Sequence, residues 1–289
     1  PGFTITTEVC NYFTENKNLP NSLDNEIRQA VSKLENLSDK CFGGEGTPLL
    51  LSVRSGGRVS MPGMMDSILN IGLNDSNVSQ LAEAFNDERF ALDSYRRLIQ
   101  MYSNVVLGVE HERFEAVLAN KKRMDNVVSD ADFNVDQLNW IINAYKNTVE
   151  RFTDSLFPQE PYEQLTGAIE AVFNSWQNKR AATYRKINNI PDSWGTGATI
   201  QTMVFGNLND KSGTGVAFTR NPSNGDKELY GEYLINAQGE DVVAGIRTPH
   251  PITKHSKVEQ ESLESKFPKA YKELLEISTK LENHFKEAQ

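Results

Sequence analysis

The segment LLSVRSGGRVSMPGMMDSILN, residues 50–70, combines two arginines with a glycine-rich loop. An apolar run leads into Arg54, and Arg58 follows after Ser-Gly-Gly. Glycines let backbone N–H groups approach an anion closely, and an arginine at a strand end can contact two phosphate oxygens at once. A helix opening at Ser67 would add its positive N-terminus. The pattern fits an anion-binding loop and, equally well, a structural turn whose arginines pair with carboxylates or water.

Three methionines surround the Pro-Gly turn of this loop: Met61, Met64 and Met65. Methionine is flexible and polarizable, so it suits either an irregular gap in a core or the face of a planar ring. We expect these side chains to form a flexible lid or an apolar wall against a planar base, with core filling as the alternative.

Two further segments hold weaker candidates for nucleotide contacts. Gln201 lies in the β-like run ATIQTMVFGN, where its amide could meet an adenine edge, although such glutamines are usually solvated. Gly213, Gly215 and Arg220 belong to SGTGVAFTRNP, which fits a plain β-hairpin better than a phosphate loop.

Acidic residues in GEYLINAQGED offer oxygen ligands of the kind that Mg²⁺ prefers. They are Glu232, Glu240 and Asp241. Carboxylates in loops are usually solvated, so the local pattern alone leaves the metal ligands unknown.

The elements that would position these residues follow from hydrophobic periodicity. The sequence predicts a helix over 21–39, a short strand ending at Arg54, amphipathic helices over 78–184, and a final helix over 259–288. β-like runs with turn residues between them occupy the stretch after Pro191. This order predicts an α+β fold with a long helical insert. We expect three parts, namely 1–77, 78–186 and 187–289.

Composition narrows the class of protein. The chain has 289 residues, a net charge of −9 and only two cysteines, Cys10 and Cys41. The negative charge argues against nucleic acid or an anionic membrane as a partner, and no apolar run approaches the ~18 residues of a transmembrane helix. Two cysteines are too few for a disulfide framework, which fits a reducing compartment. The four histidines lack metal spacing, and the motifs GxxxxGK[ST] and GxGxxG are absent.

Several long phrases resemble the amino-terminal, nucleotide-binding part of the pyruvate, phosphate dikinase family. These phrases are SVRSGGRVSMPGMMDSILNIGLND, DSYRRLIQMYSNVVLGV, SWGTGATIQTMVFGN and SGTGVAFTRNPSNGDKELYGEYLINAQGEDVVAGIRTPHPI. The resemblance extends over essentially all of the chain. It implies an ATP-grasp-like fold that binds ATP between two α+β subdomains, with Mg²⁺ as cofactor and ammonium or potassium as activator.

The resemblance also implies a reaction and its partners. Members interconvert ATP, phosphate and pyruvate with AMP, diphosphate and phosphoenolpyruvate. A histidine on a separate swivelling domain of the same chain carries the β-phosphoryl group to a distant pyruvate site. The enzyme is a homodimer or larger oligomer, located in cytoplasm, plastids or glycosomes.

Site residues carry over by motif. The resemblance implies that Arg54 contacts the ATP phosphates and that Gln201 lies on the strand lining the adenine pocket. Gly63 and Ser67 would lie in the phosphate-side loop and at the start of the following helix, with Met64 and Met65 adjoining. The segments near the cleft supply four more residues: Gly213, Gly215, Arg220 and Glu232.

The sequence departs from the family pattern at both ends. The family's glycine-rich stretch with a nucleotide-binding lysine would precede Pro1, and its strands with an acidic pair would follow Gln289. We therefore expect a piece of a longer polypeptide that lacks turnover by itself. Arg58 has no family role. Two alternatives stay open: a phosphoenolpyruvate synthase, which uses water in place of phosphate, and a non-catalytic module that docks a partner through the helical insert.

Overall fold

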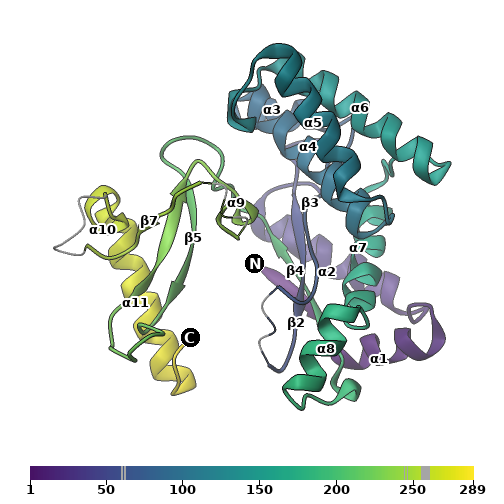
Figure 1. The fold of residues 1–289 in the computed structure, drawn as a ribbon. Coiled ribbons are helices and arrows are strands. Elements are labelled where there is room, and N and C mark those ends of the chain that lie inside the picture. The colour runs from purple at the N-terminus through teal and green to yellow at the C-terminus, as the bar shows by residue number, and fades with distance from the viewer. Residues whose placement is uncertain (60, 62, 244, 246, 255–260) are drawn as a thin grey trace. The chain divides into compact units, whose positions relative to one another are not determined.

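The computed structural model describes residues 1–289 except 60, 62, 244, 246 and 255–260. The chain forms two compact units, Pro1–Met203 and Val204–Gln289, each of which combines helices with a sheet (Figure 1). The predicted α+β class is thus confirmed. No helix in the described ranges combines the length and apolar character that crossing a bilayer requires.

The first unit is built on a four-stranded antiparallel sheet with the strand order β1-β4-β2-β3. One face of the sheet is apolar because residues alternate in direction along each strand, and Ile5, Val53, Ile68 and Ile200 on this face are all buried. Helices α1 and α7 pack on the sheet. The bounds are β1 Gly2–Ile5, β2 Leu51–Gly56, β3 Ser67–Ile71, β4 Gly197–Thr202, α1 Thr7–Asn16 and α7 Pro161–Ser175.

The prediction that a helix opens at Ser67 is wrong, because Ser67 begins strand β3. Ile68 pairs with Val53 of β2 and is fully buried, so tertiary packing holds this segment extended. Between the pairs Val53–Ile68 and Leu51–Ile71, two residues of β3 then oppose one of β2, and Asn70 takes a left-handed conformation (φ 60°), which together mark a β-bulge. The following helix begins only at Val78.

A buried glutamine fixes the loop that leaves β3. The backbone N–H of Gly72 donates to Gln164 Oε1 at 2.9 Å, and Gln164 Nε2 donates to the carbonyls of Leu73 (2.9 Å) and Pro158 (2.8 Å). Gln164 is completely buried in α7. The phrase GLND after the strand therefore links the sheet to the helices that cover it.

The amphipathic region predicted over 78–184 is helical, as expected. Helices α4 and α6 pack against each other, and α5 packs on both. Asp87 caps α4 through Phe90, and Asn134 forms a capping box with Gln137 at the start of α6. The helices are α3 Val78–Phe85, α4 Glu88–Val105, α5 His111–Asp125, α6 Val135–Thr153 and α8 Lys179–Ile187; the helix expected over 21–39 is α2 Leu23–Ser38, and short 3₁₀ turns cover Asp130–Asp132 and Asp192–Trp194.

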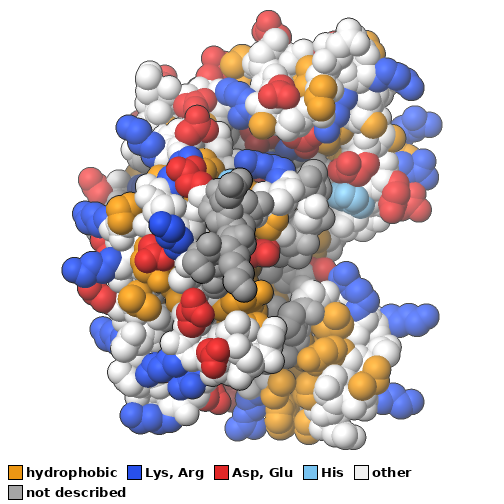
Figure 2. Space-filling model, turned by 60° about the vertical axis from the view of Figure 1, so that its left-hand side comes forward, with side chains coloured by type: hydrophobic (Ala, Val, Ile, Leu, Met, Phe, Trp, Pro, Cys, Tyr) orange, Lys and Arg blue, Asp and Glu red, His pale blue; other side chains and the backbone are white. Residues whose placement is uncertain are grey.

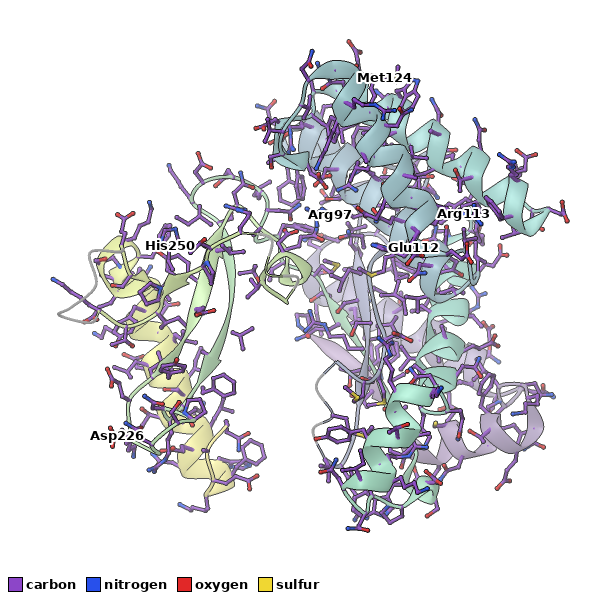
Figure 3. All side chains as sticks on the ribbon, in the orientation of Figure 1. Arg97, Glu112, Arg113, Met124, Asp226 and His250 are labelled. Carbon is purple, nitrogen blue, oxygen red and sulfur yellow. The ribbon has the colours of Figure 1, made fainter. Side chains whose placement is uncertain are left out.

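The second unit contains a three-stranded antiparallel sheet in the order β5-β6-β7. A turn that contains Ser-Asn-Gly joins β5 to β6, and Asp226 lies in this turn (Figure 3). The first two residues of the helix expected over 259–288 lie outside the described residues; the described helix begins at Leu263 and is interrupted at Phe267, before Pro268. The bounds are β5 Gly213–Phe218, β6 Tyr230–Ile235, β7 His250–Pro251, α9 Gly239–Val243, α10 Leu263–Lys266 and α11 Pro268–Phe285.

Strand β4 belongs to the first unit, since it pairs with β1 and β2. The expected division had assigned this strand to the part 187–289. The three-part division with limits at 77/78 and 186/187 stays a prediction, whereas the two units separate after Met203.

Candidate functional site

A polar face of the first sheet gathers the predicted residues Arg54, Ser67 and Gln201. Arg54 of β2 lies opposite Thr199 of β4 and opposite Ser67 of β3, and Ser52 lies opposite Gln201. Directly opposed residues share one side of an antiparallel sheet, as do residues two apart on a strand. All five side chains therefore leave the sheet on one face, opposite to the apolar face.

This face presents a cation beside neutral hydrogen-bonding groups. Arg54, Ser67 and Gln201 are exposed, and the hydroxyls of Thr4 and Thr199 are 3.2 Å apart. Among the described residues, the side chain of Arg54 forms no ion pair or hydrogen bond. Diagonal neighbours on a sheet lie about 7–8 Å apart, so one extended ligand can reach both Arg54 and Gln201. The face suits an anion attached to a flat polar ring.

Sequence reasoning missed Thr199 and Thr4 as members of this face. The signal was available, because Thr199 stands two residues before Gln201 in the β-like run ATIQT, and period-2 alternation places both on one side. Thr4 was missed because its strand β1 pairs with β4, almost two hundred residues later. Pairing over such a separation leaves no local pattern.

The loop between β2 and β3 packs on α8 and its neighbours rather than standing free. Met61 is buried in a cluster with Trp176, Ala181 and Ile190, and Met64 and Met65 pack partly buried against it. Core filling, the alternative reading, therefore describes Met61. Any contact of Met64 and Met65 with a base stays a prediction.

Polar contacts hold the same loop in place. The carbonyl of Met64 accepts from Asn178 Nδ2 at 3.2 Å, and Asp66 pairs with Arg180 at 3.0 Å. Gly63 has a left-handed backbone (φ 69°), which a side chain would strain. Its conformation gives Gly63 a structural reason to be glycine, beside its predicted place near the phosphates.

The two arginines of the loop lie in different environments. The guanidinium of Arg58 lies over the ring of Trp194, with 5.2 Å between its central carbon and the ring centroid. This distance is typical of a cation–π contact. Both arginines are exposed, and they differ in that Arg58 contacts an aromatic ring, whereas the Arg54 side chain has no such contact among the described residues.

Four predicted residues belong to the second unit. Gly213 and Gly215 lie within β5 as one strand of a hairpin, and added Cβ atoms would approach the backbone oxygens of β6 to 2.8 and 2.6 Å. Glu232 is exposed on β6, opposite Val216. Arg220 donates to the nearly buried Glu282 at 2.6 Å, so part of its charge is already neutralised within the unit.

The described part of the chain contains no group of three or more His, Cys, Asp or Glu side chains that could hold a metal ion. Asp241 accepts from the backbone N–H of Gln238 at 2.8 Å, while the side chain of Glu240 lies outside the described residues. Positive and negative side chains are interspersed over the face drawn in Figure 2. The described residues therefore supply a cation and polar groups for a ligand, but no assembled metal ligands.

Residues 15–289 match the family model of the pyruvate phosphate dikinase AMP/ATP-binding domain. The chain belongs to this family. Pyruvate, phosphate dikinases from several organisms are similar in sequence to this chain over its full length. A pyruvate, phosphate dikinase of Rhizobium meliloti (strain 1021) is 50% identical over 294 residues, and one of Clostridium symbiosum is 51% identical over 290 residues. Each alignment covers 100% of this chain.

A plant relative is also similar. The chloroplastic pyruvate, phosphate dikinase of Mesembryanthemum crystallinum is 48% identical over 288 residues, which cover 99% of this chain and 29% of that protein. The chain spans 33% of the Rhizobium protein and 32% of the Clostridium protein. This pyruvate phosphate dikinase domain therefore corresponds to about a third of its relatives, and the polar face of its sheet lies within the part matched to the AMP/ATP-binding family.

Proposed function

We propose that this chain is the ATP-binding part of a pyruvate, phosphate dikinase, and that it binds ATP in the ATP-grasp manner. The parent enzyme would convert ATP, phosphate and pyruvate into AMP, diphosphate and phosphoenolpyruvate. The β-phosphoryl group of ATP would pass to a histidine on a swivelling domain of the same parent chain. The parent enzyme would be a homo-oligomer. Membership of the AMP/ATP-binding family supports ATP as the ligand.

Arg54 carries this proposal. Its guanidinium is exposed on the polar face, and no carboxylate among the described residues neutralises it. An arginine fork matches two phosphate oxygens and keeps its charge at every physiological pH. Phosphoryl transfer relies mainly on positioning and charge neutralisation, so an arginine held on a rigid strand is suited to the task. We assign Arg54 to the ATP phosphates.

The other residues of the first unit take supporting roles. Gln201, diagonal to Arg54 on the same face, would contact the adenine side of the nucleotide. Ser67 begins β3 beside Arg54, where its hydroxyl and the nearby turn at Gly63 would border the phosphates. This arrangement replaces the helix N-terminus that the sequence had predicted, because the segment after the loop is a strand.

The family resemblance also assigns nucleotide contacts to residues of the second unit. Gly213 and Gly215 keep β5 close to β6, and Glu232 projects from the exposed face of that sheet. Arg220 is oriented by Glu282. We propose Mg²⁺ as cofactor and ammonium or potassium as activator on the family resemblance alone. The described residues do not assemble a metal site, and we assign no ligand to either ion.

The phosphate requirement of the full-length parent tests the proposed reaction. With ATP and pyruvate present, a dikinase that uses phosphate should form AMP only when inorganic phosphate is added. A phosphoenolpyruvate synthase would form AMP without that addition, because it transfers the other phosphoryl group of ATP to water and releases it as phosphate. Undiminished AMP formation in phosphate-free buffer would therefore contradict the proposed reaction while leaving ATP binding in place.

A further inference from the structure

A pocket of about 530 Å³ opens in the first unit beside helix α7, on the covered side of the sheet. Its lining includes carboxylates, among them Glu163 and Glu170 of α7, together with apolar side chains such as Leu107 and Pro158. Arg54 leaves the opposite face of the sheet, so this pocket is separate from the proposed nucleotide site.

The hydroxyl of a largely buried tyrosine, Tyr102, opens into the pocket. Tyr102 is only 2% exposed, and its ring packs edge-on against Phe157 with 5.7 Å between centroids. Among the described residues, no group forms a hydrogen bond with the Tyr102 hydroxyl. The hydroxyl oxygen is not among the buried atoms that lack a partner, so it is open to the pocket, where a ligand group can take the place of water as its hydrogen-bond partner.

Gly167 makes room for this hydroxyl. Gly167 lies in the interior of α7, and a Cβ at that position would lie 2.4 Å from the Tyr102 oxygen. Glycine inside a helix is less stable than alanine, because it gains more freedom on unfolding. The helix thus contains a destabilising glycine at the position where the Tyr102 hydroxyl enters the pocket wall. The missing Cβ leaves room for the hydroxyl.

The negative charge of the pocket is not balanced by its own residues. Among the described residues, neither Glu163 nor Glu170 forms an ion pair. Arg28, the one basic residue among the described residues of the wall, pairs with Asp24 at 2.9 Å and lies over the ring of Tyr162. Burial raises the pKa of Tyr102, and the charges of Glu163 and Glu170 raise it further, so these carboxylates act on the hydroxyl.

The dipole of helix α7 stabilises the negative charge of only one of the two carboxylates. Glu163 lies in the first turn of α7, where a negative charge complements the helix dipole. Glu170 lies two turns later, and burial raises its pKa, so its charge is retained at a cost in the free protein. A bound cation would remove that cost.

We propose that this pocket binds an organic cation, an ammonium or guanidinium group on an aliphatic stem. Glu163 and Glu170 neutralise its charge, and the Tyr102 hydroxyl oxygen accepts a hydrogen bond from one of its N–H groups. The aliphatic stem lies along Leu107 and Pro158. A bare metal ion fits less well. The pocket far exceeds the ~30 Å³ that one water molecule occupies in the liquid, and the described residues form no group able to coordinate a metal.

Calorimetric titration of the 289-residue chain with agmatine tests the proposal, because agmatine carries both cationic groups on a short stem. The variants are Tyr102→Phe and Glu170→Gln, with Glu26→Gln as a matched control that removes a charge from an exposed position of α2. We expect the first two variants each to raise the Kd roughly tenfold, the effect typical of one hydrogen bond to a charged group. The control should bind like the unmodified chain.

Three outcomes would overturn the proposal. The first is no binding of agmatine at millimolar concentration by a chain whose circular dichroism is native. The second is an equal Kd for all variants. The third is competition by potassium chloride beyond that of choline chloride at the same ionic strength, which would assign the pocket to a small inorganic ion. Because Tyr102→Phe keeps the packed ring, and Glu170→Gln keeps the side-chain shape, both variants preserve the fold.

Discussion

Arg220 donates its Nε–H to Glu282 at 2.6 Å, and this contact ties the turn after β5 to helix α11. Glu282 is only 8% exposed and also accepts from Lys227 at 3.4 Å. The hydrogen bond and charge of Arg220, followed by those of Lys227, hold the pKa of Glu282 below its ordinary value. A residue expected near the phosphates is therefore also a structural link within the second unit.

Replacing Arg220 should destabilise the second unit in a pH-dependent manner. A carboxyl whose pKa is lowered on folding stabilises the fold above its unfolded pKa and loses this contribution as pH falls through the folded pKa. Arg220→Met should therefore lower the urea midpoint at pH 7, followed by circular dichroism, and differ less from the unmodified chain at acid pH. A difference independent of pH would show that the ion pair contributes nothing.

A buried ion pair should matter more to the helical region than an exposed one. Asp93 and Arg96 of α4 are 5% and 2% exposed and lie 2.8 Å apart, and Arg97 also pairs with Asp93 (Figure 3). Burial raises the pKa of Asp93, but the charges and hydrogen bonds of both arginines outweigh burial and hold it well below its usual range. Asp93→Ala should cost about 3–5 kcal/mol of unfolding free energy, because it leaves buried charge uncompensated.

The exposed pair between Glu110 and Arg113 is the matched control for Asp93. Its side chains are 67% and 50% exposed, with the charges 2.9 Å apart. Glu110→Ala should change the unfolding free energy by about 1 kcal/mol or less. Urea unfolding of both variants gives the comparison, and equal costs would contradict the account of the α4 network.

Neighbouring residues of β4 should separate binding from stability. Gln201 is exposed on the polar face, whereas Ile200 is fully buried on the opposite face. In the full-length parent, Gln201→Ala should weaken ATP binding by roughly fivefold, the effect of one neutral hydrogen bond, and leave the unfolding midpoint unchanged. Ile200→Ala should instead cost about 2–4 kcal/mol of stability, as for other large-to-small core changes. A large loss of stability with Gln201→Ala would contradict its exposed position.

Local sequence patterns predicted the elements whose stabilising contacts are local. The helices over 78–184 and the β5–β6 hairpin are confirmed because periodicity and turn residues are properties of short segments. Ser67 was placed in a helix, since the five residues SILNI carry no clear period, and only pairing with β2 makes them a strand. Strand β1 was missed for the same reason, because its partner β4 lies at the far end of the unit.

The candidate site was predicted in part. Motif resemblance selected Arg54 and Gln201, and the register of β2 and β4 places both on one face. Neither motif nor composition could show that Met61 packs on Trp176, or that Arg220 pairs with Glu282 sixty-two residues later. Such contacts depend on the tertiary fold.

The most direct test of the central claim is isotope exchange between AMP and ATP, with phosphate and diphosphate present, in the full-length parent carrying Arg54→Ala. Arg58→Ala is the matched control, because Arg58 lies in the same loop but over Trp194. Exchange should fall by about 10²–10³-fold with Arg54→Ala, the loss expected when a preorganised group that stabilises transition-state charge is removed. It should change little with Arg58→Ala, and the pyruvate half-reaction should continue in both variants. Unchanged exchange with Arg54→Ala would contradict the assignment of Arg54 to the ATP phosphates.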